Sequence, residues 1–233
     1  MRACCLLLAC LAAPLAAQPA PPDPALAPQD DVRGAALALT LTNDGFGLGA
    51  FARGPLTRDL AWTLGLSGRP GKDEREQQFF VGLFGDTVIP FKRSYFLMVP
   101  LEAGVERRLF RDRIRPTFRP FVHAAGGPVL GYQWPYFDDL DGNGLNDDEP
   151  TPGTFGLLDE GELRFGVGGS VSFGAYVDTS VRSALGFRFG YAAAHFFRDV
   201  ELLENDLRVE NPTRRFFGTP VLGVQFVRRF GVE

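Results

Sequence analysis

A short acidic segment of the chain has oxygen ligands at the spacing of a calcium-binding loop. Such loops place ligands at alternate positions around one cation, with glycine at the sharp turn and a bidentate carboxylate at the end. Gly144 fits the turn, but Pro150 stands where the final carboxylate is expected. The segment therefore predicts either a Ca²⁺ site that stiffens a loop or an ordinary solvated acidic loop. The candidate ligands are Asp139, Asp141, Asn143, the carbonyl of Leu145, and Asp147.

A second set of residues could do acid–base chemistry if the fold brought its members together. Paired carboxylates and a histidine can act as general acid and base, whereas in a narrow protein interior the same groups neutralise one another. We expect the second arrangement. Because the chain has no nucleophile-elbow, metalloprotease, phosphate-loop or paired-cysteine motif, we predict that it is not an enzyme. The residues are Glu102, Glu106, Arg108, Arg119, His123, Glu162, Arg164 and Arg188.

The elements that carry these residues follow from a two-residue alternation, which is the period of a strand whose two faces meet different surroundings. In the segment 162–177, bulky apolar residues such as Phe173 alternate with small or polar residues such as Ser172. Segments 95–110 and 185–197 alternate in the same way. A soluble sandwich would carry long charged residues on its polar side. Here the polar side suits a narrow interior and the bulky side suits lipid.

Strand and loop lengths favour a barrel that crosses a membrane. The segments exceed the mode of about 5 to 6 residues for globular strands and cover the roughly 9 to 11 residues that a tilted strand needs to cross a bilayer. Short and long connections alternate, as they do between the two ends of an outer-membrane barrel. We predict an all-β fold, an eight-stranded antiparallel transmembrane up-and-down β-barrel. Its strands are expected at 35–42, 45–53, 60–68, 94–110, 117–133, 160–177, 183–197 and 216–230.

Two details of this barrel are expected from the same alternation. His123 should face inward and His195 outward, so the two histidines do not pair. The segment 76–91 alternates enough to form either a strand of its own or an extension that rises above the membrane.

The N-terminal residues predict export. Residues 1–17 have the basic start, short apolar stretch and small residues of a cleaved signal peptide. Residues 18–33 are rich in proline and predict a disordered tether, so that residues 34–233 form the barrel domain. All three cysteines lie in the leader. The sequence around Cys10 also resembles a lipoprotein cleavage box, which would instead make Cys10 a lipidated N-terminus.

Three further stretches resemble the small outer-membrane β-barrel family, whose best-known members are OmpA and OmpX. "GFGLGAFARGPLTRDLAWTLGL" (45–66) looks like the second strand of the family, its turn and its third strand. "RPFVHAAGGPVLGY" (119–132) is similar to an Arg-Pro-aromatic strand with spaced glycines, and "GVQFVRRF" (223–230) to the aromatic-ended last strand. The resemblance implies an OmpA/OmpX-like barrel in the bacterial outer membrane that is inserted by the barrel insertion machinery.

Aromatic residues gather near the expected strand ends. They predict interfacial girdles at the membrane surface, with a hydrophobic core or a ligand pocket as the alternative. They are Tyr95, Phe96, Tyr132, Trp134, Tyr136, Phe137, Phe196, Phe197, Phe216 and Phe217.

We therefore expect a monomeric, non-enzymatic outer-membrane barrel with a packed lumen and long extracellular loops, and a structural, adhesion or surface-interaction role. Its expected partners are outer-membrane lipid and an unknown extracellular ligand. The mild net charge of −4 and the scattered arginines argue against nucleic-acid binding. One alternative is a soluble or lipid-anchored periplasmic lipocalin-like barrel that carries a small apolar ligand, with its bulky faces inward. Another is a barrel enzyme with an active site at the outer leaflet.

Overall fold

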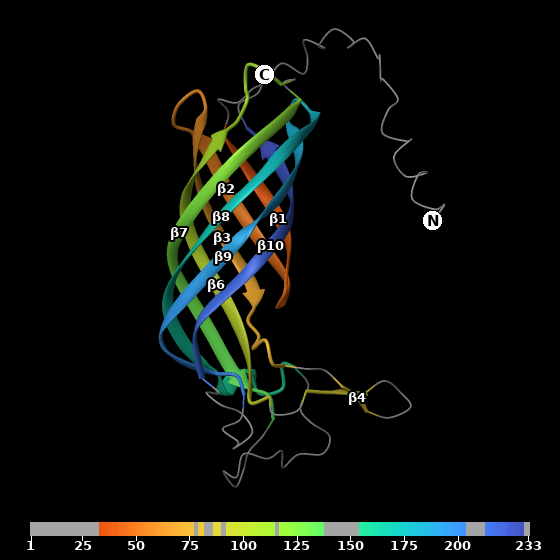
Figure 1. Ribbon diagram of the computed structural model, residues 1–233, viewed down its shortest axis with the longest axis vertical. Helices are drawn as coiled ribbons and strands as arrows, with labels where there is room; N and C mark the ends of the chain where they lie inside the picture. Colours follow the sequence, from red (N-terminus) through yellow and green to blue (C-terminus); the bar gives the residue numbers. More distant parts are fainter. Residues whose placement is uncertain are drawn as a thin grey trace, which may run out of the picture.

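The computed structural model shows a single closed β-barrel (Figure 1). It describes residues 33–76, 79–81, 86–89, 92–114, 117–137, 154–203 and 213–230. The barrel strands are β1 (Gly34–Thr42), β2 (Gly45–Pro55), β3 (Leu60–Pro70), β6 (Ser94–Arg108), β7 (Phe118–Pro135), β8 (Glu162–Ser180), β9 (Ser183–Glu201) and β10 (Thr213–Arg229). Every pair of neighbours is antiparallel, and β1 pairs with β10 to close the ring. The predicted eight-stranded up-and-down barrel is confirmed.

Several predicted strand ends differ from the structure. β9 continues to Glu201 beyond the predicted 197, and β10 begins at Thr213 before the predicted 216. Two other strands differ where they meet a turn. The strand expected at 94–110 stops at Arg108, because Phe110 takes a left-handed backbone conformation with φ 54° in the turn that follows. The strand expected at 160–177 begins at Glu162, after a short 3-10 helix η3 (Leu158–Glu160), and continues to Ser180. In these two strands the differences lie at turns, where backbone conformation rather than side-chain alternation decides where a strand ends.

The described residues of the segment 76–91 do not enter the barrel. Two short strands, β4 (Phe79–Val81) and β5 (Asp86–Val88), pair with each other in a separate two-stranded sheet. β3 pairs directly with β6, so the ring closes without them. Of the two predictions for this segment, the extension beyond the barrel wall is the one that the strand pairing supports.

The two ends of the barrel are built differently (Figure 1). At one end β1 begins, β10 ends, and the strands are joined across 56–59, 109–117 and 181–182. We call this the short-turn end. At the opposite, long-loop end the connections cover 71–93, 136–161 and 202–212, together with one tight hairpin between β1 and β2. In that hairpin Gly45 has a φ of 133°, a conformation that side-chain-bearing residues rarely adopt.

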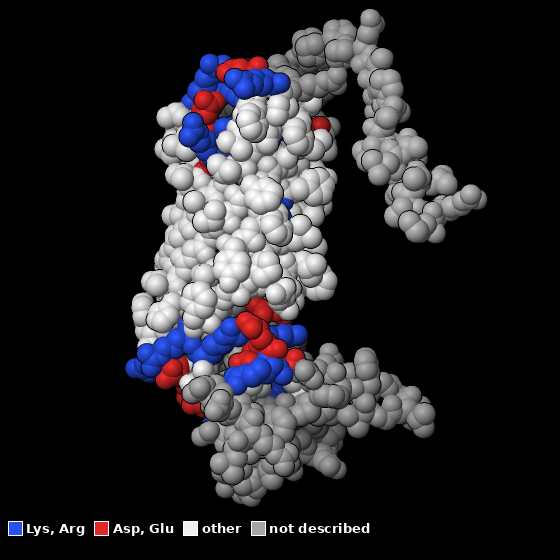
Figure 2. All heavy atoms as spheres, in the orientation of Figure 1, with Lys and Arg blue, Asp and Glu red and all other residues white. Residues whose placement is uncertain are grey.

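The bulky apolar residues of the barrel point outward. Leu163, Phe165, Val171 and Phe173 on β8 are between 52% and 67% exposed. Leu37, Phe46, Leu48, Phe187, Phe189, Tyr191, Leu222 and Phe226 continue this surface around the ring. On the face drawn in Figure 2, charged side chains gather at the two ends, with an almost uncharged band between them. Such a band, with strands of this length, is the surface that lipid requires.

The outward side chains of the band are uncharged. Among the outward positions of the eight described barrel strands, none between the two rims carries a charged residue. No helix among the described residues is long and apolar enough to span a bilayer. The uncharged outward band, with polar residues turned into the lumen, is the surface expected of a membrane-spanning barrel.

Candidate functional site

The lumen holds most of the charged residues that the sequence singles out. Glu106, Arg119 and His123 are each about 4% exposed. His195, in contrast, is exposed on the outer wall of β9, where its strand neighbours are Val167 and Phe216. The prediction that one histidine faces inward and the other outward is confirmed.

Tyr176 is the centre of a hydrogen-bonded network near the short-turn end. Its hydroxyl donates to the Glu106 carboxylate at 2.8 Å and lies 3.2 Å from the Gln225 side-chain oxygen. The Arg53 guanidinium lies 3.0 Å from Glu106 and 5.1 Å from the centre of the Tyr176 ring, and Phe121 stacks on that ring at 4.6 Å. Side chains from β2, β6, β7, β8 and β10 thus meet in one cross-section of the lumen.

Asp178 joins two arginines just beyond this network. Arg119 reaches its carboxylate at 2.5 Å, and Arg229 binds the same oxygen. Arg119 also lies over the Tyr176 ring at 5.6 Å, so the ion pairs continue directly into the Tyr176 network. One carboxylate shared by two buried guanidinium groups satisfies part of their charge within the barrel.

The middle of the lumen is polar and less completely paired. The His123 Nε2 lies 3.0 Å from the Thr63 hydroxyl, and Ser170 donates to Glu102 at 3.3 Å. The Arg188 guanidinium lies 5.2 Å from the centre of the Phe51 ring. Within the described part of the chain, His123 Nδ1 and Arg188 Nε have no hydrogen-bond partner.

The Thr63 and His123 pair has one feature of a nucleophile and its base, which the sequence reasoning missed. Such pairs work when a third group holds the other ring nitrogen of the histidine, and when substrate can reach the hydroxyl. Among the described residues no group bonds His123 Nδ1, and both side chains are buried within the barrel. The arrangement supports a structural hydrogen bond rather than an acid–base site.

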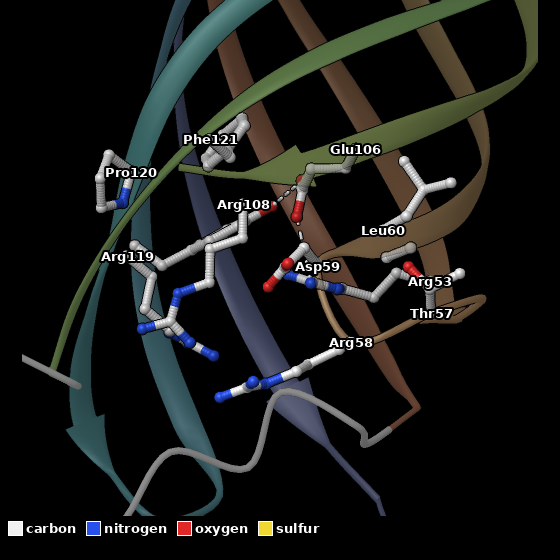
Figure 3. Close-up of a pocket in the computed structure, with 12 residues that line it drawn as sticks. Arg53, Thr57, Arg58, Asp59, Leu60, Glu106, Arg108, Arg119, Pro120 and Phe121 are labelled. Atoms are coloured by element: carbon white, nitrogen blue, oxygen red, sulfur yellow. Dashed lines mark hydrogen bonds and ion pairs between the residues drawn. The ribbon is translucent and has the colours of Figure 1, made fainter. Parts of the chain in front are cut away.

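A small cavity opens beside the Tyr176 network at the short-turn end (Figure 3). Arg53, Glu106, Arg108 and Arg119 point toward it, together with Asp59 from the turn between β2 and β3. Its volume is about 20 Å³. A cavity needs roughly 10 to 15 Å³ to hold one water molecule. This cavity therefore has room for about one water molecule among its charged groups.

The long-loop end is closed by aromatic side chains. Phe96, Phe196 and Phe217 meet at centroid distances of 5.0, 5.2 and 5.7 Å. Met98, Val129, Ala194, Val200 and Leu202 complete this cluster, which we call the aromatic plug. The prediction that these three phenylalanines belong to an interfacial girdle is wrong. In each adjacent pair, alternation sends one ring inward and the other, such as Phe197 or Phe216, outward.

Two outward aromatics at this end are covered by the chain itself. Trp134 donates to the carbonyl of Thr154 at 2.7 Å and is 7% exposed, and the Tyr132 hydroxyl donates to the carbonyl of Leu158 at 2.5 Å. Tyr95 stacks on Trp134 at 5.5 Å. The segment that leads into η3 therefore covers part of the predicted girdle.

Residues 71–76 and 92–93 close over the aromatic plug with a buried ion pair. The Lys92 Nζ lies 2.8 Å from the Glu76 carboxylate, and the two side chains are 4% and 2% exposed. Lys92 also lies 4.6 Å from the centre of the Tyr95 ring. The Glu76 carboxylate accepts a hydrogen bond from the backbone of Asp73, whose own carboxylate binds Arg75.

Glu162 and Arg164 are separated from the deeper charges. Their ion pair, at 2.5 Å, lies at the long-loop end of β8, and the Glu162 side chain is 67% exposed. The predicted set of inward charges is therefore divided between a buried group and a pair at the rim. The predicted calcium ligands Asp139, Asp141, Asn143, Leu145 and Asp147 lie outside the described residues. Elsewhere, in the part of the chain that the structure describes, no cluster of acidic, histidine or cysteine side chains could hold a metal ion.

Several members of the lumen networks were missed by the sequence reasoning. Tyr176 has the same parity on its strand as the small residues Ser172 and Gly174, so the alternation could have placed it inward. Gln225, Arg53, Asp178 and Arg229 follow the same rule on their strands. The odd or even position of a residue along its strand gives the face on which it lies, but it does not say which residues meet across the barrel.

No family model and no curated protein matches the chain. Among solved structures, Neisserial surface protein A (NspA) is similar at 12% identity, over 85% of this chain and 94% of that one, with a TM-score of 0.43. The N-terminal β-barrel domain of Pseudomonas aeruginosa OprF matches at 10% identity over 84% and 97%, with a TM-score of 0.35. The outer membrane enzyme PagL matches at 11% identity over 84% and 98%, with a TM-score of 0.36.

The predicted resemblance to the small outer-membrane β-barrels holds at the level of the fold. It rests on the closed ring of eight antiparallel strands and on the outward apolar band of this chain. A fold of this kind hosts different functions, so activity has to be argued from the residues themselves.

Proposed function

We propose that this chain is a bacterial outer-membrane β-barrel without enzymatic activity, exported through a cleaved signal peptide. Its lumen is closed, and its long loops face the outside of the cell, where they support adhesion, contact with an extracellular ligand, or the integrity of the membrane. The observation that carries this proposal is the outward apolar band around a packed lumen. The band supports a lipid environment, and the alternation of short and long connections supports the orientation.

The state of the lumen favours a structural role over transport. The aromatic plug fills the long-loop end, where Phe196 is completely buried and Phe96 is 3% exposed. The Tyr176 network crosses the short-turn end, beside a cavity of about 20 Å³. An eight-stranded barrel has an interior just wide enough for its side chains. We expect no ion conductance when the purified protein is inserted in a planar bilayer.

The lipocalin-like alternative requires the opposite arrangement of faces. A carrier of a small apolar ligand would turn its bulky apolar residues inward around a cavity. Here Val171 and Phe165 are 67% and 60% exposed on the outer wall. The inward positions opposite them on the same strand are small or polar, such as Gly168 and Ser172. These faces favour the membrane barrel.

The first experiment compares electrophoretic mobility of the outer-membrane fraction in detergent, with and without boiling. A folded membrane barrel resists the detergent and shifts its mobility on heating. Val171→Arg, in the middle of the band, should make membrane insertion less favourable by about 2–4 kcal/mol and reduce the amount of the heat-modifiable form. Leu56→Arg, in the turn between β2 and β3, is the matched control because Leu56 is also exposed, at 54%, but lies outside the band.

The result separates the two kinds of barrel. In a soluble carrier Val171→Arg would be a surface substitution, worth within about 0.5 kcal/mol. Recovery of a folded Val171→Arg variant from the periplasm would therefore overturn the proposal. Hydrolysis of lipid A or of peptides by the purified wild-type protein would instead overturn its non-enzymatic part.

We further propose that the loop at 139–147 binds Ca²⁺ and stiffens an extracellular connection. The support is the spacing of oxygen ligands in its sequence. Calorimetric titration of the folded barrel with CaCl₂ should give a binding isotherm that the double variant Asp139→Ala, Asp141→Ala abolishes. The variant Asp159→Ala keeps these ligands and serves as the control. Equal heats for all three proteins would sink the calcium proposal and leave the barrel proposal untouched.

A further inference from the structure

The outer wall of the barrel is hollowed on one side. A groove with a volume of about 520 Å³ runs over β10, β1, β2, β3 and β6. Its lining is almost entirely apolar, and it lies within the band that faces outward. We call it the alanine groove, because Ala35, Ala50 and Ala52 form its floor.

The strand register explains why the wall is hollow there. Ala35 pairs with Ala52 between β1 and β2, so two small outward residues lie side by side. Ala50 pairs with Leu37 on one side and with Leu66 on the other. Larger outward residues therefore border the three alanines. These borders are Leu37 and Phe226 on one side and Leu64, Leu66 and Leu101 on the other.

The groove ends beside arginine at the short-turn end. Arg228 lines it and pairs directly with Ala35 between β10 and β1. Arg33 lies two residues before Ala35 and is outward by the same alternation. Its carbonyl accepts a hydrogen bond from the Phe230 amide. Both arginines are exposed, and neither has an ion-pair partner among the residues that the structure describes. The groove is thus apolar along its length and positively charged at one end.

We infer that the alanine groove binds one anionic glycerophospholipid of the inner leaflet of the membrane. An acyl chain lies along the alanine floor, and the phosphate meets Arg228 and Arg33. This inference rests on the proposed membrane location, because only a barrel in lipid presents this face to acyl chains. Two cations at the interfacial end of an apolar groove match the charge and the shape of a lipid with a net negative head group.

A lipid suits the groove better than a second barrel does. The outer wall of a second barrel is stiff and could fill the groove only with projecting side chains, whereas a flexible acyl chain adopts the shape of the groove and gains contact along it. The positive charge at the end of the groove also favours a lipid over a second copy of the chain. Two copies that meet at this groove would bring Arg228 and Arg33 close to the same arginines of the partner. Like charges at such an interface oppose association.

Native mass spectrometry of the full-length barrel, released from detergent, tests this directly. The protein is incubated with phosphatidylglycerol or with phosphatidylcholine of the same acyl chains. We expect preferential retention of one phosphatidylglycerol. Arg228→Gln should lower that retention about fivefold, the effect of one basic residue near an anionic surface. Ala50→Leu, which fills the groove with a side chain of the kind that borders it, should lower retention of both lipids.

Two matched controls lie away from the groove. Ala124→Leu makes the same change at an outward position on β7, and Arg113→Gln removes an exposed arginine from the turn between β6 and β7. Both should bind lipid as the wild type does. Equal retention of the two lipids, or retention that Ala50→Leu leaves unchanged, would overturn the inference. So would a dimer that Ala50→Leu disrupts, because a second copy would then occupy the groove.

Each variant is first checked for the heat-dependent mobility shift. If the wild-type protein shows no mobility shift, the membrane-barrel proposal itself is overturned. If the protein shows the mobility shift but retains no phosphatidylglycerol, only the lipid inference is overturned. The two failures are therefore distinguishable in the same preparation.

Discussion

The Arg53 guanidinium lies 3.0 Å from the Glu106 carboxylate, although β3 separates the two strands that carry them. Their side chains are only 18% and 5% exposed. The pair therefore lies inside the lumen and bridges over β3, instead of joining two adjacent strands of the wall. Tyr176 completes it from β8 by donating a hydrogen bond to the same carboxylate group. This contact fixes the distance between two segments of the wall that share no backbone hydrogen bonds.

Removing one partner of this pair should be costly. Glu106→Ala leaves the Arg53 guanidinium in the interior without its carboxylate, and we expect the free energy of unfolding to fall by about 3–5 kcal/mol. Urea titration in detergent micelles, followed by the heat-modifiable gel band, measures the change. Asp112→Ala breaks the exposed pair with Arg58, whose side chains are 70% and 79% exposed, and should cost only about 0–1 kcal/mol. Equal effects of the two substitutions would contradict the role of the Tyr176 network.

The aromatic plug should contribute more to stability than the outward aromatic residues beside it. Phe96→Ala removes a ring that packs on both Phe196 and Phe217, and should lower the free energy of unfolding by about 3–5 kcal/mol. Phe197→Ala is the matched control, because Phe197 is 61% exposed on the outer wall. The same urea titration should show a smaller loss for it. A larger loss for the outward residue would mean that the plug is loosely packed.

Gly127 should not tolerate a side chain, whereas Gly68 should. A Cβ at Gly127 would collide with the backbone carbonyl of Leu101 on β6, which cannot move without disturbing the strand pairing. A Cβ at Gly68 meets no atom within 4 Å. We expect Gly127→Ala to reduce the yield of heat-modifiable barrel on refolding into micelles. Gly68→Ala should refold as the wild type does or gain about 0.4–1 kcal/mol. A normal yield from Gly127→Ala would show that the wall can separate there.

Acid should loosen the segment that covers the aromatic plug. Burial alone would raise the pKa of Asp73, but hydrogen bonds from the side chain and amide of Arg75 outweigh burial and hold that pKa below its ordinary value of 3.8. A carboxylate whose pKa is lower in the folded protein stabilises it above the unfolded pKa. That contribution is lost as the pH falls through the folded pKa, so the effect belongs to the range below about pH 4.

Hydrogen exchange at the amides of Arg75 and Glu76, corrected for the intrinsic pH dependence, measures this loosening. Protection should fall in the wild type as the pH drops below about 4. In Asp73→Asn, protection should already be low at pH 7 and change little with acid. Glu74→Gln removes a neighbouring carboxylate whose side chain is 82% exposed, and should keep the wild-type profile. An acid profile of Asp73→Asn that matches the wild type would assign the effect to another group.

Alternation predicted the wall of the barrel because each strand meets two different surroundings throughout its length. Phe173 and Ser172 show this most simply: their types differ, and the structure places one outside and the other inside. The orientation of adjacent aromatic residues was harder to predict. Phe196 and Phe197 are identical in type, so composition suggests a girdle, and only their parity separates a residue of the plug from one that faces lipid.

The contacts across the lumen could not be predicted from one sequence. Arg53 meets Glu106 because the tilt and stagger of the strands bring distant positions to the same level. The cover over Trp134 depends on a loop whose carbonyl at Thr154 happens to reach the indole, and no periodic pattern encodes such a contact. The alanine groove likewise requires the register that sets Ala35 beside Ala52.

The aromatic plug and the cavity beside Tyr176 make the interior of the barrel one-sided. The cavity at the short-turn end has room for about one water molecule beside Glu106 and Arg119, whereas the three packed rings of Phe96, Phe196 and Phe217 close the opposite end. The charged groups that line the cavity therefore lie beside an opening at the short-turn end and away from the plugged end. Water should therefore exchange with the Tyr176 network from the short-turn side, even though the barrel wall runs from one side to the other.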